Sequence, residues 1–127
     1  MTFTKQYLRK ILRTNSPDTI VNGKPLLFWT LDKPKLVHLL LDTDANPNID
    51  FEIEPGISVT PLFVTKLFIE KLNRLRRLYS SLTHLDCMTK IDRTIHHLRE
   101  TRRMLTTCGG HATAYRKYIR LDIGPKK

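Results

Sequence analysis

The spacing of apolar and polar residues along the chain predicts a series of short helical and extended segments. Residues 4–14 carry apolar side chains three and four positions apart, which is typical of an amphipathic helix. Thr4 suits the N-cap of this helix and Asn15 its C-terminal cap, and Pro17 cannot continue it. The polar positions of the segment are mostly basic: Lys5, Arg9, Lys10 and Arg13.

The next segment predicts a hairpin and then a short helix. Asn22-Gly23 stands between two apolar runs and favours a type I′ turn, so we expect a β-hairpin over residues 19–31 with Pro25 at an edge or a bulge. Asp32 precedes an apolar run with a proline in its first turn, which predicts a helix of about two to three turns that Asp32 caps. His38 lies in this run and is expected at the core or its boundary.

Two further segments alternate as strands do. In residues 49–54, Ile49, Phe51 and Ile53 point one way and acidic residues the other, which predicts a half-buried strand with an acidic outer face. Residues 113–123 also alternate, with basic groups outward. We expect this strand to pair beside 49–54, because opposite charges on neighbouring strands attract.

From Thr60 the period becomes helical and predicts two long helices. Apolar residues repeat at intervals of three and four along two successive stripes, which indicates an antiparallel αα-hairpin over about 60–106. The first stripe is Val64, Phe68, Leu72, Leu75, Tyr79 and Leu82, and the second is Met88, Ile91, Ile95, Leu98, Arg102 and Leu105. The pattern as a whole predicts one mainly helical α+β domain over 1–127, with a small antiparallel sheet from about 19–31, 49–54 and 113–123.

Composition adds the class of protein. The chain has 127 residues, 40% of them hydrophobic and 27% charged, which is ordinary for a globular domain. No apolar run has the length of a membrane-spanning helix, and residues 1–13 lack the apolar stretch of a secretory signal. We therefore expect a cytoplasmic protein, or a nucleoid or nuclear one if it associates with nucleic acid, with reduced cysteines and no cofactor.

Charge is distributed unevenly along the chain. The formal net charge is +10, yet residues 1–59 hold seven Lys and Arg against seven Asp and Glu, whereas residues 60–127 hold fifteen against five. We call these the charge-neutral half and the basic half. A concentration of cations like the second is typical of proteins that bind a polyanion, because each Lys or Arg that meets a phosphate releases a condensed counterion.

The predicted contacts lie on the outer faces of the hairpin and on the C-terminal strand. Cations on a rigid element suit a phosphate backbone, and an aromatic between them can stack on an unpaired base. The sequence therefore predicts a non-catalytic protein that binds RNA or DNA. The candidate residues are Lys66, Lys71, Arg74, Arg77, Arg93, His96, Arg99, Arg103, Arg116, Tyr118 and Arg120.

Two other functions stay open. A small adaptor or inhibitor would use the same basic face against an acidic protein surface. A nuclease would use His96, His97 or His111 in general acid–base chemistry. The sequence has no Gly-rich phosphate loop, no HExxH and no GxSxG motif to support an enzyme, so we expect binding without catalysis.

The two cysteines raise the question of a metal. His84 and Cys87 form one pair and Cys108 and His111 a mirrored one, each with two residues between, a spacing that a structural zinc accepts. If residues 88–106 form one continuous helix, however, Cys87 and Cys108 lie roughly 30 Å apart along its axis. We therefore expect no metal at this set.

Overall fold

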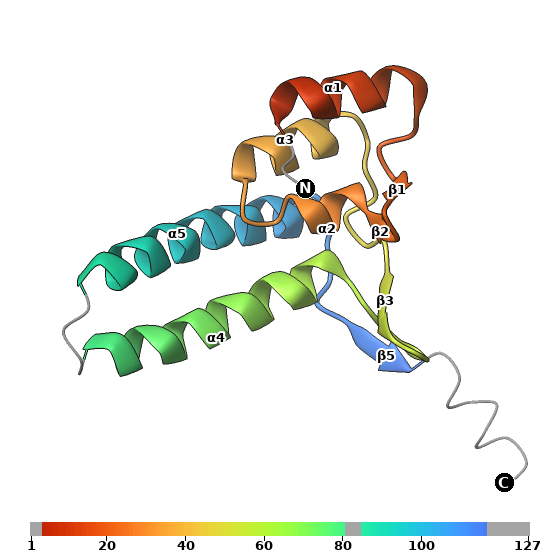
Figure 1. Cartoon of the computed structure of the whole chain (residues 1–127). Coiled ribbons are helices and arrows are strands. Elements are labelled where there is room, and N and C mark those ends of the chain that lie inside the picture. Colours follow the sequence, from red (N-terminus) through yellow and green to blue (C-terminus); the bar gives the residue numbers. More distant parts are fainter. Residues whose placement is uncertain (1–3, 81–84, 117–127) are drawn as a thin grey trace, which may run out of the picture.

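The computed structural model of the chain describes residues 4–80 and 85–116. It confirms the α+β class, with helices forming most of the molecule (Figure 1). The helices are α1 (Lys5–Thr14), α2 (Leu26–Trp29), α3 (Pro34–Asp42), α4 (Pro61–Ser80) and α5 (Leu85–Thr107). The strands are β1 (Ile20–Val21), β2 (Lys24–Pro25), β3 (Phe51–Glu54), β4 (Ile57–Val59) and β5 (Ala114–Arg116).

Helices α4 and α5 form the predicted antiparallel αα-hairpin and dominate the fold. Figure 1 shows them side by side, with α1, α2 and α3 gathered near the end where α4 begins and α5 ends. The second predicted stripe is confirmed, because Ile91, Ile95, Leu98 and Leu105 of α5 are all buried. The other end of the hairpin extends away from the N-terminal helices.

The first predicted stripe is partly wrong. On α4 the buried residues are Pro61, Leu62, Thr65 and Ile69, whereas Phe68 and Leu75 remain 45% and 40% exposed. Apolar residues occupy two adjacent rows of this helix, and spacing alone cannot tell which row will face α5.

None of the described helices is long and apolar enough to cross a bilayer.

The N-terminal helix follows the prediction closely. The backbone N–H of Tyr7 donates to the Thr4 hydroxyl at 3.1 Å, which is the expected N-cap. At the other end the side-chain amide of Asn15 donates to the carbonyl oxygen of Ile11 at 3.1 Å. One side of the helix packs on the core through Leu8, which is fully buried.

The start of α3 differs from the prediction. Lys33, not Asp32, stands at the position before the helix, and no side chain caps its N-terminus. Pro34 at the first helical position has no N–H to satisfy, and the Leu36 N–H donates to the Lys33 carbonyl oxygen at 2.9 Å. His38 is exposed rather than at the core, and it pairs with Asp42 one turn later (Nδ1 to Oδ2, 3.3 Å).

The segment 19–31 is a hairpin only in its first half. The turn is confirmed, since Asn22 and Gly23 have φ angles of 50° and 80°, as a type I′ turn requires. The predicted second strand is wrong beyond Pro25, because residues 26–29 form the short helix α2. Leu26, Leu27 and Phe28 are all buried, which an alternating strand with one wet face would not allow.

The strands form two sheets rather than one. β1 pairs with β2, and a separate antiparallel sheet has the order β3-β4-β5. The predicted direct pairing of 49–54 with the C-terminal strand is therefore wrong, since β4 lies between them. Ile53 is 48% exposed because a register shift between Glu52 and Glu54 breaks the alternation of β3. Residues 117–123 of the predicted C-terminal strand lie outside the described residues.

The buried core joins both halves of the sequence. It draws side chains from α1, α2 and α3, from β4 and from both long helices. The Phe28 and Phe51 rings lie 5.3 Å apart and extend it toward the larger sheet. Two polar connections hold the end of α5 in place: the Thr113 N–H donates to the Thr60 hydroxyl at 3.0 Å, and the His111 N–H donates to the Asn48 side-chain oxygen at 2.7 Å. The start of α4 and the end of α5 are therefore fixed beside the N-terminal helices.

Candidate nucleic-acid interface

The predicted binding residues of the hairpin are exposed or half-buried, but they do not form one surface. Lys66 of α4 lies with Arg102 and Arg103 of α5 around a hollow of about 380 Å³. Lys71, five residues further along α4, lines a different hollow of about 430 Å³ with Thr94 and Leu98 of α5. Five residues correspond to roughly 140° around a helix, which accounts for the separation.

Two of the predicted residues, Arg74 and His96, and the neighbouring Arg76 form ion pairs with carboxylates. Arg74 pairs with Glu70 one turn away on α4, and Arg76 pairs with Asp92 across the hairpin. His96 lies 3.1 Å from the Glu100 carboxylate on α5 (Nε2 to Oε1). These pairs are all solvent-exposed and contribute little to stability, but the two arginine pairs reduce the positive charge of the outer face of α4.

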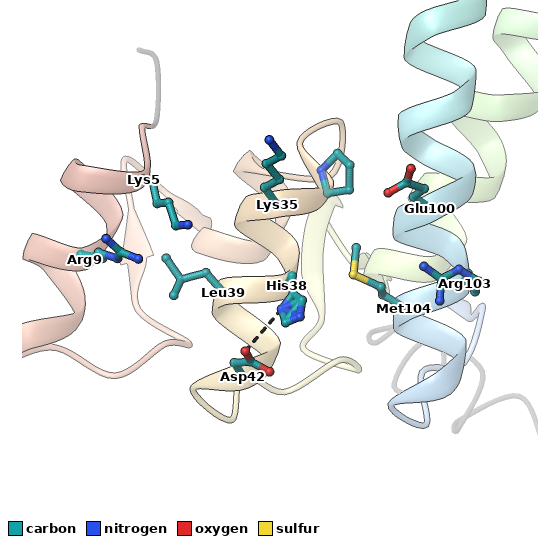
Figure 2. Close-up of a pocket in the computed structure, with 10 residues that line it drawn as sticks. Lys5, Arg9, Lys35, His38, Leu39, Asp42, Glu100, Arg103 and Met104 are labelled. Atoms are coloured by element: carbon teal, nitrogen blue, oxygen red, sulfur yellow. Dashed lines mark ion pairs between the residues drawn. The ribbon is translucent and has the colours of Figure 1, made fainter.

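A larger hollow, of about 490 Å³, lies between α1, α3 and α5 (Figure 2). α3 forms its floor, and α1 and α5 form its two walls. Lys5 and Arg9 enter it from α1, Lys35 from α3 and Arg103 from α5. Arg103 is shared with the hollow that Lys66 lines, so it stands on the ridge between two basic depressions.

The cations of this hollow are available to a ligand. Within residues 4–80 and 85–116, no ion pair involves any of the four cations, which are Lys5, Arg9, Lys35 and Arg103. The two carboxylates of the hollow each have a histidine beside them, Asp42 with His38 and Glu100 with His96. The N–H donors of these four side chains are therefore not used in ion pairs and can contact an anion.

Because Arg103 borders both hollows, their cations lie along one band of the surface, which we call the α5 basic surface. Arg102 directly precedes Arg103 and lines the same hollow as Lys66 of α4, and Arg99 lies one turn before Arg103 on the same helix. Cations held on four packed helices keep fixed spacings, as contacts with a phosphate backbone require. The α5 basic surface consists of Lys5, Arg9, Lys35, Lys66, Arg99, Arg102 and Arg103.

Sequence reasoning missed part of this surface. Lys5, Arg9 and Lys35 belong to the charge-neutral half, whose charges sum to zero. Within that half, however, most basic and most acidic residues lie in different segments. All four charged residues of α1 are basic, while most acidic residues of that half follow position 41. The charge of each predicted helix, taken separately, would have identified α1 as a basic helix. It would not have shown that α1 lies near α5.

The C-terminal candidates are only partly described. Arg116 is the last residue of β5, and Tyr118 and Arg120 lie outside the described residues. β5 pairs with β4 at the edge of the sheet, so its main-chain position is at the opposite side of β4 from the acidic β3. A contribution of this strand to binding stays a prediction.

The cysteine and histidine pairs are separated by a long helix. α5 runs without a break from Leu85 to Thr107, so Cys87 and Cys108 lie roughly 30 Å apart along its axis. Ligands of a single zinc lie within about 4 Å of each other. Cys87 and Cys108 therefore cannot bind the same ion within one chain. His84 lies outside the described residues, and the described part of the chain contains no cluster of three His, Cys, Asp or Glu side chains.

The histidines do not meet in a way that suits a nuclease. The rings of His96 and His97 have centroids 6.0 Å apart on α5, and His111 follows the end of that helix. At 1.5 Å per residue, the ten residues from His97 to the end of α5 cover about 15 Å. The described residues thus provide no pair of histidines converging from two elements on one hollow.

An apolar depression occupies another side of the hairpin. Phe28 and Leu31 from α2 and the loop after it face Phe68, Leu72 and Leu98 there. Phe68 is nearly half exposed. This depression contains only one of the predicted binding cations, Lys71.

The chain was compared with known proteins at the levels of family, sequence and structure. No protein-family model, no curated protein and no solved structure matches it. Inference about function therefore depends on the residues themselves.

Proposed function

We propose that this protein binds nucleic acid, without catalysis, through the α5 basic surface. The observation that carries the proposal is the convergence of α1, α3, α4 and α5 on Arg103. Cations from all four helices border the two hollows that Arg103 separates. A net charge of +10 adds a long-range attraction for any polyanion.

The geometry favours a phosphate backbone over scattered anions. Successive phosphates of one strand are several ångströms apart and need cations distributed along a path, which a band over four helices provides. All three residues that α5 contributes to the surface are arginines. Their planar guanidinium groups can form two parallel hydrogen bonds with one phosphate. Backbone contacts of this kind read no sequence, so we expect binding to many sequences.

The test is a salt titration of binding to labelled single-stranded and duplex oligonucleotides of mixed sequence. If four of the seven cations contact phosphates, the logarithm of the association constant should fall with the logarithm of salt concentration with a slope of about −3.6 on duplex DNA. Absence of binding to either form at low salt, with the protein folded, would contradict the proposal. An acidic protein partner, the alternative that the sequence left open, would then be the remaining use of this surface.

A further inference from the structure

The large hollow beside α3 has two chemically different parts. Its walls carry the cations Lys5 and Arg9 on one side and Arg103 on the other. The His38 imidazole and the Leu39 side chain come from the α3 floor, as does Lys35, and the apolar side chain of Met104 extends from the α5 wall toward α3 (Figure 2). A second, smaller hollow of about 140 Å³ continues past His38 and Met104 toward Cys108, so these two side chains lie where the depressions join.

The His38 ring is held by its neighbour. Its Nδ1 atom lies 3.3 Å from the Asp42 carboxylate one turn later on α3, while the imidazole stays 60% exposed. An aromatic ring that is both oriented and exposed is suited to stacking against a base, with little loss of side-chain freedom on binding.

The floor suits a base better than a phosphate. The Asp42 carboxylate beside His38 would repel a phosphate placed there but not a neutral base. Met104 is half-buried and extends from α5 toward the side of α3 that carries His38, where it offers apolar contact (Figure 2). The volume of about 490 Å³ lies within the range of sites for small ligands and is open enough for one nucleotide.

We infer that this hollow takes an unpaired nucleotide, with its base against His38 and Met104 and its flanking phosphates against the Lys5–Arg9 and Arg103 walls. The inference rests on the proposed function and deepens it, because it names single-stranded nucleic acid as the preferred ligand. In a duplex the bases are stacked inside the helix and cannot reach the floor, whereas the bases of a single strand can stack on protein side chains.

The test compares a single-stranded oligonucleotide with a duplex of the same length. His38→Ala should lower the affinity for the single strand about fivefold or more, which is the low end of what one lost stacking contact costs. The affinity for the duplex should stay unchanged, and so should the salt dependence with the single strand, since no phosphate contact is removed. His38→Phe should restore single-strand binding, because it supplies a ring without a charge.

His96→Ala is the matched control, and it should leave the ratio of single-strand to duplex affinity unchanged. His96 is also exposed and also pairs with a carboxylate one turn later, but it lines a different hollow, beside Asp32 and Lys33. An equal effect of His38→Ala on both nucleic-acid forms, no effect on either, or a failure of His38→Phe to restore binding would overturn the inference while leaving the proposed function standing. If the unaltered protein binds neither the single strand nor the duplex, that result would instead contradict the proposed function.

A competition experiment adds an independent readout. A nucleoside monophosphate should displace the single-stranded oligonucleotide at lower concentration than inorganic phosphate does, because only the nucleotide brings a base to the floor. Equal competition by the two compounds would show that the hollow recognises the phosphate alone, and would overturn the inference.

Discussion

The Thr101 hydroxyl on α5 donates a hydrogen bond of 2.7 Å to the carbonyl oxygen of Leu31, a residue 70 positions earlier in the chain. Thr101 is fully buried and Leu31 is 3% exposed, so the bond lies inside the core. It attaches the loop between α2 and α3 to the helix that contributes three of the seven residues of the α5 basic surface. Because buried backbone groups need partners, this bond helps to fix where α3 lies relative to Arg103.

Replacing Thr101 by Val should destabilise the fold. Valine keeps the shape of the side chain but leaves the Leu31 carbonyl without this donor, which costs about 1–3 kcal/mol of unfolding free energy. Urea denaturation followed by circular dichroism measures it. Thr65→Val is the control, because the fully buried Thr65 hydroxyl bonds only the Pro61 carbonyl of its own helix, 2.8 Å away. Equal losses in the two variants would show that the long-range bond has no special weight.

Asn48 should matter for the end of α5. Its side-chain oxygen accepts from the His111 N–H at 2.7 Å, and its side-chain nitrogen donates to the Gly109 carbonyl at 3.1 Å. Asn48→Ala removes both bonds and should cost about 1–2 kcal/mol, since each is partly open to solvent. Amide hydrogen exchange at His111 should become faster in this variant. Asn48→Asp keeps the acceptor and should protect that amide, and unchanged exchange in Asn48→Ala would contradict the prediction.

The two glycines after α5 should differ in their tolerance of a side chain. A Cβ atom on Gly110 would lie 2.7 Å from the Leu105 carbonyl oxygen, too close for any ordinary contact. Gly110→Ala should therefore cost more than Gly109→Ala. Gly109 has a φ of 89° but open space around it, so alanine there meets only the backbone strain of about 1 kcal/mol. Thermal or urea unfolding of the two variants decides, and the reverse order would be inconsistent with this helix terminus.

Removal of charge from the α5 basic surface should weaken nucleic-acid binding more than removal of the same charge elsewhere on the hairpin. The double variant Arg99→Ala and Arg103→Ala should lower affinity roughly tenfold or more in about 0.2 M salt and flatten the salt dependence by about 1.8, the value for two phosphate contacts. The control is Lys71→Ala with Lys90→Ala, which removes two exposed cations outside the α5 basic surface. Equal losses would show that only the overall charge matters.

Helix α1 should contribute in a position-dependent way. Lys5 and Arg9 line the large hollow, whereas Lys10 and Arg13 of the same helix are exposed and do not. Lys5→Ala with Arg9→Ala should therefore weaken binding several-fold more than Lys10→Ala with Arg13→Ala, although both pairs remove two cations from one helix. Fluorescence anisotropy at fixed salt measures the difference. Similar affinities in the two variants would exclude α1 from the interface.

Local patterns predicted local structure well. Thr4 and Asn15 delimit α1 as their cap propensities suggest, and Asn22-Gly23 makes the expected turn, because the conformations of caps and turns depend on neighbouring residues alone. The prediction for the segment after Pro25 is wrong because its three consecutive buried residues are placed by contacts with the core. A helical turn buries all three, whereas a strand with one solvent-exposed face would not, and these contacts outweigh the local preference for a strand.

The candidate site shows the same division. Basic residues along α5 were evident from the sequence, and their exposed positions follow from the helical period. Their partners were not evident, because Lys5, Arg9 and Lys35 come from a half with no net charge and reach Arg103 only through the packing of α1 and α3.

By itself, the sequence determined the α+β class, the two long helices, the continuity of α5 and the excess of positive charge, since all of these depend on residue type and spacing within a single element. Only the tertiary structure decided which row of α4 faces α5, which strands are neighbours, and which cations share a surface. Those outcomes depend on contacts between segments far apart in the chain, and many combinations of rows and faces satisfy the same local pattern. The packing around Leu8, Leu31 and Thr101 allows one of these combinations, and that combination brings the cations of the α5 basic surface together.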